Sequence, residues 1–130
     1  GSAVRSRMLH GKSCSAKQYL DALHQMNLWR AEFSEQMNDI DALVTPTTID
    51  CAIPVDEVDE QVLPAHFTRA TNVLGLCALA IPSAHSPDDL PISICIHGHP
   101  FHDSHILRIG WALEQALGES SRIPRGLELE

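Results

Sequence analysis

Four of the eight histidines lie close together near the C-terminal end of the chain, at His97, His99, His102 and His105. His102 and His105 are separated by three positions around a predicted helix start, and this spacing can bring two imidazoles to one metal ion. No cysteine or glutamate follows at a matching spacing, and His97 and His99 fit the alternation of a strand. We therefore interpret the cluster as surface or turn histidines, with a metal pair at His102 and His105 as the alternative.

Lys12, Ser13 and Ser15 are the residues that could form an activated nucleophile. A lysine–serine pair needs a glycine-rich segment whose N–H groups bind an oxyanion, and this stretch has none. Gly11-Lys12-Ser13 also resembles the end of a phosphate loop, but Ser6 occupies the position that requires glycine. The nucleophile elbow, the HExxH zinc motif and the dinucleotide fingerprint are all absent from the sequence. The residues alone predict neither a catalytic centre nor a cofactor.

The composition, net charge and cysteine spacing limit the classes of protein to which the chain can belong. The 130 residues are 44% hydrophobic, enough for one domain or a piece of a larger one, and the net charge of −8 argues against a nucleic-acid partner. No stretch is apolar for long enough to span a membrane. Gly1-Ser2 is typical of a scar left by tag removal. The four cysteines, at positions 14, 51, 77 and 95, form no CxxC pair and predict reduced thiols in a cytoplasmic protein, with Cys77 and Cys95 in the core.

Residues 67–82 are the segment around which the chain is organised. We expect a short helix at 68–73, after which Gly75 takes the left-handed conformation. The apolar run 77–81 predicts a strand buried on both faces, which Pro82 ends because proline has no N–H. Gly75 and Pro82 are thus the predicted structural seam between helix and sheet. Valine at Gly75 is expected to be strained and to clash with this seam.

The preceding segment predicts a long helix and a strand. Ser15 and Gln18 have the spacing of a capping box, and the helix that follows carries an apolar stripe of Tyr19, Leu23, Met26, Phe33, Met37 and Ile40. Arg30 falls on this stripe, so its guanidinium either pairs with a carboxylate or binds an anion in a cleft. Residues 41–45 read as a short buried strand, and 47–64 as a solvated loop.

The following segment predicts a turn at 83–90, a strand at 92–97 with one apolar face, and a final helix capped by Asp103. Gly118 ends that helix, whose buried stripe is Ile106, Gly110, Leu113 and Leu117. Residues 119–130 are expected to be loosely held. The order of elements predicts an α/β fold in which helices are layered on a mixed sheet, with residues 3–118 as one domain or one segment of a larger domain.

Several segments together resemble the C-terminal part of amidase signature enzymes. They agree with that family in order and spacing over about residues 5–117. They comprise RMLHG at 7–11, Tyr19, Ala22, Arg30, DALVTPT at 41–47, FT at 67–68, Asn72, Gly75-Leu76, Pro82, LPI at 90–92, Gly98, Pro100-Phe101 and Glu114. The resemblance implies hydrolysis of amides by a lysine and two serines that lie far upstream in a glycine- and serine-rich segment. This chain lacks that segment, so we expect it to be inactive alone.

The resemblance also implies substrate-binding residues. In family members that act on amino-acid amides, an arginine at the position of Arg7 holds the substrate, but the carboxylate expected just before the FT motif is Ala65 here. Thr68 and Asn72 are the other two candidate substrate-binding residues. Thr68 and Arg69 face either the cleft toward the missing part or solvent, and the structural alternative for Asn72 is a helix-end cap or a hydrogen bond to the neighbouring loop. Cys77 stands where the family usually has proline. No catalytic residue can be carried over to this chain.

Two classes of function follow. The chain is either the C-terminal segment of an amide hydrolase, paired with the rest of that enzyme, or a standalone binding or oligomerisation module. We expect self-association in both cases, because the predicted sheet leaves strand edges and apolar faces uncovered.

Overall fold

The computed structural model describes residues 1–59, 62 and 64–118, so the predicted tail at 119–130 lies outside the described residues. The predicted order of helices and strands is confirmed. The sequence does not predict one helix, α1, because residues 3–14 lack an apolar stripe. The elements are α1 Ser2–His10, η1 Gly11–Ser13, α2 Ala16–Gln36, β1 Leu43–Pro46, η2 Val55–Glu57, α3 Thr68–Leu74, β2 Cys77–His85, β3 Pro91–Gly98 and α4 Asp103–Leu117.

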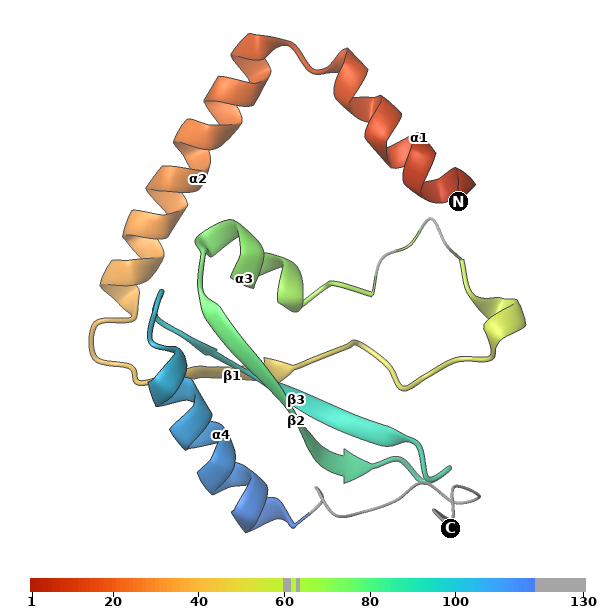
Figure 1. Cartoon of the computed structure of the whole chain (residues 1–130), viewed down its shortest axis with the longest axis vertical. Coiled ribbons are helices and arrows are strands. Elements are labelled where there is room, and N and C mark those ends of the chain that lie inside the picture. The colour runs from red at the N-terminus through yellow and green to blue at the C-terminus, as the bar shows by residue number, and fades with distance from the viewer. Residues whose placement is uncertain (60–61, 63, 119–130) are drawn as a thin grey trace.

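A three-stranded sheet in the order β1-β3-β2 forms the centre of the structure, and both pairings are antiparallel (Figure 1). Ile96 of the central strand is fully buried and pairs with Leu79 of β2 and Val44 of β1. Together with Ile81 and Ile106 it forms the core between the sheet and α4. Because side chains alternate along a strand, His97 faces the opposite side of the sheet, where α3 lies. Helices thus lie on both faces, in agreement with the predicted layered fold, but the sheet of the described residues is antiparallel and not mixed.

Helix α4 approaches the sheet closely because Gly98 and Gly110 carry no side chains. A Cβ at Gly98 would overlap Ile106, and a Cβ at Gly110 would overlap Leu79. The predicted cap of this helix is wrong: Asp103 is its first residue, and His102 precedes it without a side-chain cap. The predicted end is confirmed, since Gly118 is left-handed at φ 70°. Ile106 and Gly110 of the stripe are buried, whereas Leu117 is exposed.

Two strand predictions are wrong in burial and extent. Strand β2 does not stop at Pro82 but continues to His85, with a shift of register between Pro82 and Ala84. It is an outer strand, so the missing N–H of Pro82 costs no ladder hydrogen bond. It is also not buried on both faces, since Ala78 and Ala80 are exposed. Strand β1 likewise exposes Leu43 and Val44.

Helices α1 and α2 form an arm that stands away from the sheet (Figure 1). The predicted capping box at Ser15 and Gln18 is present, with hydrogen bonds in both directions. The predicted apolar stripe is nevertheless only partly covered: no residue of Ala16–Gln36 is buried, Met26 and Phe33 are half-buried, and Tyr19 is 59% exposed. Met37, just beyond the helix, is buried, at 4% exposure.

The seam at Gly75 has the predicted backbone, and a Cβ alone would not produce the clash predicted for valine. Gly75 has φ 72°, a conformation that side chains disfavour. A Cβ there would meet only Nε of Arg30, at an ordinary 3.9 Å. The cost of alanine at this position is therefore backbone strain alone.

We expect Gly75→Ala to lower the free energy of unfolding by about 1–2 kcal/mol, the cost of a left-handed residue that carries a Cβ. Urea unfolding measures the loss. Gly11→Ala is the matched control, because Gly11 has φ −60° and open space around it. Equal midpoints for the two variants would contradict a strained Gly75.

Candidate functional site

Helix α3 carries two of the three predicted substrate-binding residues on one face. Thr68 begins the helix and is half-buried, and Asn72 lies four residues later and is exposed. Residues four apart share a helix face, so the Thr68 hydroxyl and the Asn72 amide lie one above the other. Ala65, where relatives are expected to have a carboxylate, is half-buried just before the helix, and its carbonyl accepts the N–H of Arg69 at 3.1 Å. This face of α3 therefore offers a hydroxyl and an amide for hydrogen bonding. Alanine at position 65 means that the carboxylate expected there is missing.

Arg7 lies on α1, a different element from Thr68 and Asn72, and its side chain is exposed. Figure 1 shows α1 at the outer end of the arm, whereas α3 lies between α2 and the start of β2. The sequence resemblance groups the three residues, but in this structure they belong to separate parts of the chain.

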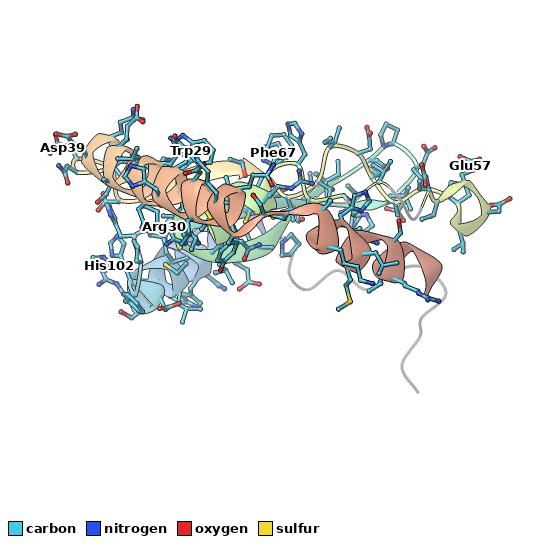
Figure 2. The ribbon with its side chains drawn as sticks, turned by 90° about the horizontal axis from the view of Figure 1, so that it is seen from above. Trp29, Arg30, Asp39, Glu57, Phe67 and His102 are labelled. Atoms are coloured by element: carbon cyan, nitrogen blue, oxygen red, sulfur yellow. The ribbon has the colours of Figure 1, made fainter. Side chains whose placement is uncertain are left out.

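Arg30 binds the C-terminal end of α3. Its Nε donates a hydrogen bond of 2.8 Å to the carbonyl of Val73, a main-chain partner instead of the carboxylate considered from the sequence. Carbonyls in the last turn of a helix carry partial negative charge, which a guanidinium offsets. Figure 2 shows Trp29 and Arg30 on different sides of α2. Arg30 thereby connects α2 to the residues that lead into Gly75.

A groove of about 290 Å³ lies beside this contact, between the end of α2, the end of α3 and the β3–α4 turn. Its walls are mainly apolar and include Phe33, Met37, Leu74, Leu76 and Pro100. His99 lines the groove as well, and its Nε2 lies 3.2 Å from the carbonyl of Ile40. The contact fixes the β3–α4 turn against the segment that follows α2.

His97 lies beneath α3, with its ring between two threonine hydroxyls. Nε2 is 2.9 Å from Oγ1 of Thr45 on β1, and Nδ1 is 2.7 Å from Oγ1 of Thr71 on α3. The side chain is only 3% exposed, and this burial lowers the pKa of His97 below its ordinary value. The alternation at 92–97 does place His97 on the face away from the core isoleucines, but its threonine partners lie 52 and 26 residues away in the chain.

His99, His102 and His105 lie around the start of α4 together with Asp41. His105 Nε2 lies 3.4 Å from Oδ1 of Asp41, and the rings of His99 and His102 are 5.5 Å apart. In the part of the chain that the structure describes, no three side chains of His, Cys, Asp or Glu gather closely enough to hold a metal ion. His102 and His105 thus belong to a polar surface around the start of α4.

The cysteines differ in burial but share one state. All four are free thiols, Cys95 is buried in β3, and this burial raises its pKa. Cys77 is half-buried, and its Sγ donates to the carbonyl of His99 at 3.1 Å.

Among the described helices, none is long and apolar enough to cross a membrane.

Comparison with known proteins identifies the family. Residues 1–107 match the family model described as Amidase. The chain belongs to the amidase family. This amidase chain is 31% identical to the A subunit of glutamyl-tRNA(Gln) amidotransferase from Methylacidiphilum infernorum and 32% identical to that of Brevibacillus brevis. In each case 95% of the chain is covered, but only 27% of the relative.

Solved structures agree with this assignment. A crystal structure of an amidase matches with a TM-score of 0.76 at 29% identity, over 88% of this chain and 28% of that one. The glutamyl-tRNA(Gln) amidotransferase A subunit from Thermotoga maritima matches with 0.68 at 28% identity, over 88% and 27%. The allophanate hydrolase of Kluyveromyces lactis, at 22% identity, shares the fold with a TM-score of 0.79, over 99% and 23%. The chain therefore spans about a quarter of the length of the relatives it matches.

Proposed function

We propose that this chain is the C-terminal segment of an amidase-family amide hydrolase and that it is catalytically silent alone. The observation that carries the proposal is the extent of the match: the relatives cover 95% of this chain, yet the chain accounts for only 27% of their length. The resemblance implies that the lysine and two serines lie far upstream of the segments that match, and this is the second ground for the proposal. Within the described residues, Lys12 and Ser13 are exposed, and the Ser13 hydroxyl donates to the carbonyl of His10 instead of facing a base.

In this proposal the segment contributes to substrate binding. The hydroxyl of Thr68 and the amide of Asn72 can donate to and accept from an amide substrate, and they share one face of α3. Arg7 on α1 would bind a negatively charged group of the substrate. The four free thiols support the cytoplasmic location expected from the cysteine spacing.

A chimera tests this function. The N-terminal three-quarters of the Thermotoga maritima relative, ending where the match begins, would be joined to residues 3–118 of this chain. We expect the chimera to hydrolyse a simple amide, whereas this chain alone and the truncated relative alone do not, because neither holds both the nucleophile and the covering segment. A folded but inactive chimera, or turnover by this chain alone, would contradict the proposal.

Two variants of the chimera separate binding from folding. Asn72→Ala is expected to raise KM with little change in kcat, as removal of a substrate-binding group does. Ser104→Ala is the matched control, because Ser104 is also exposed but lies on α4. Circular dichroism would first confirm that all chimeras are folded.

We also propose that the isolated chain associates with a second copy of itself. The specific observation is the arm, where the 21 residues of Ala16–Gln36 include none that is buried although several of them are apolar. Most of the stability of a helix in a protein comes from the packing of its apolar face. A partner that covers α2 would stabilise it.

A further inference from the structure

His97 is the point at which three elements of the fold meet. It lies in the central strand β3 and is only 3% exposed. Its ring is hydrogen-bonded to the hydroxyl of Thr45 on β1 and to the hydroxyl of Thr71 on α3. Buried polar groups cost free energy unless they are hydrogen-bonded, and both ring nitrogens have a partner here. No role for this residue follows from amide hydrolysis.

The hydroxyl of Thr45 determines the tautomer. Its Oγ1 donates to the carbonyl of Pro46 at 2.9 Å, so toward His97 it can only accept. Nε2 must therefore carry the proton and donate to Thr45. Nδ1 then has no hydrogen and accepts the hydroxyl of Thr71 at 2.7 Å. The result is a directed chain of three hydrogen bonds, from Thr71 through the neutral imidazole and Thr45 to Pro46.

Among the described residues, none stands ready to stabilise a protonated ring by an opposite charge. Thr45 and Thr71 are uncharged, and β2 presents Ala78 opposite His97. The titratable or charged groups of the surrounding elements are Cys95 on the same face of β3, Cys77 on the other face of β2, the exposed Arg69 on α3, and His85 at the other end of β2. Within the described part of the chain His97 forms no ion pair, and burial alone lowers its pKa.

We propose that His97 makes the docking of α3 on the sheet dependent on pH: the neutral ring fastens α3 through Thr71, and protonation releases it. A proton on Nδ1 would point at the hydroxyl hydrogen of Thr71. Rotation of that hydroxyl can restore a bond, but it leaves a positive charge buried without a counterion. Undocking of α3 exposes the ring to water and removes this cost.

The direction of the pH dependence follows from the lowered pKa. The folded chain binds the proton less readily than the unfolded chain, whose histidine has its ordinary pKa near 6.5. The stability that neutral His97 contributes is fully present above that value and is lost as pH falls toward the folded-state pKa. Because α3 carries Asn72 and accepts Arg30 at Val73, its release would also loosen the contact with α2.

Hydrogen exchange measured by NMR tests the proposal on the intact chain. After correction for the intrinsic pH dependence of exchange, protection of the α3 amides of residues 72–74 should fall between about pH 7.5 and about pH 5. The fall should be roughly tenfold for each unit by which the pKa is lowered. His97→Gln keeps a donor and an acceptor but cannot be protonated in this range, so its protection should not change. His24→Gln, at an exposed histidine of α2, should behave like the parent chain. A parallel fall in parent and His97→Gln, or no fall in the parent, would overturn the proposal.

A second set of measurements decides the question if His97→Gln does not fold. The ¹⁵N spectrum of the His97 ring should show Nε2 protonated and Nδ1 unprotonated at neutral pH, and the opposite tautomer would overturn the proposal. Thr71→Val removes the hydroxyl with little change in shape and should give weak α3 protection that no longer depends on pH. Thr71→Ser keeps the hydroxyl and should retain the dependence. Equal behaviour of the valine and serine variants would also overturn it.

Discussion

Gly98→Val is expected to lower the free energy of unfolding by about 3 kcal/mol, the upper part of the range for overpacked cores. A Cβ at Gly98 would overlap two atoms of the Ile106 side chain and lie 3.2 Å from Sγ of Cys77. Ile106 is 2% exposed and sits between α4 and the sheet, so it has no free space into which to move. Valine favours strands by its intrinsic propensity, but that preference spans only about 1 kcal/mol, and the steric cost therefore prevails.

Urea unfolding measures this effect, and a double variant identifies its cause. Gly11→Val is the matched control, because nothing lies within 4 Å of a Cβ at Gly11, and it should stay within about 0.5 kcal/mol of the parent chain. Ile106→Ala makes room beside residue 98. Gly98→Val combined with Ile106→Ala should therefore cost less than the sum of the two single changes. Strict additivity would show that α4 does not approach the sheet at this glycine.

The features that the sequence predicts correctly are those set by neighbouring residues. Ser15 and Gln18 form their capping box within one turn, and Gly75 and Gly118 end their helices through their own backbone freedom. The alternating isoleucines of β3 likewise carry their pattern within six residues. Each of these signals needs no knowledge of what packs against the segment.

The errors concern burial and partners, which depend on distant segments. The apolar run 77–81 predicts a strand buried on both faces, but its alternate alanines are exposed because α4 covers only one side of β2. Pro82 is a poor guide to the end of this strand, because proline is tolerated on an outer strand and the sequence does not reveal strand order. Asp103 has the residue type that favours a helix cap, but His102 occupies the cap position.

The candidate site shows the same limit. Thr68 and Asn72 can be placed on one helix face from their spacing alone. Arg30 falls on the predicted apolar stripe, but its partner is the main-chain carbonyl of Val73, 43 residues away. Every residue has such a carbonyl, so the pattern of side chains cannot indicate which one an arginine will bind. His97 is similar, since only the fold brings Thr45 and Thr71 to its ring. Local patterns can indicate which residues are unusual but not what they contact.

We expect the isolated chain to be larger than its monomer mass of 14.3 kDa in solution, and the arm to be the cause. Tyr19 and Leu23 lie on the same face of α2 and both are exposed. The strand edges offer a weaker alternative than the sequence suggests, because β1 has only four residues and the pairing of β2 shifts at Pro82. The net charge of −8 opposes association, so added salt should favour it.

Light scattering over a wide range of concentrations measures the mass, and two double variants locate the interface. Tyr19→Glu with Leu23→Glu places two carboxylates on the apolar face of α2 and should return the mass to 14.3 kDa. His24→Glu with Gln25→Glu adds two carboxylates to a different, exposed face of the same helix and should leave the association intact. Loss of association in both variants would implicate charge repulsion instead of the arm. A parent chain that stays at the monomer mass throughout, even in high salt, would contradict self-association altogether.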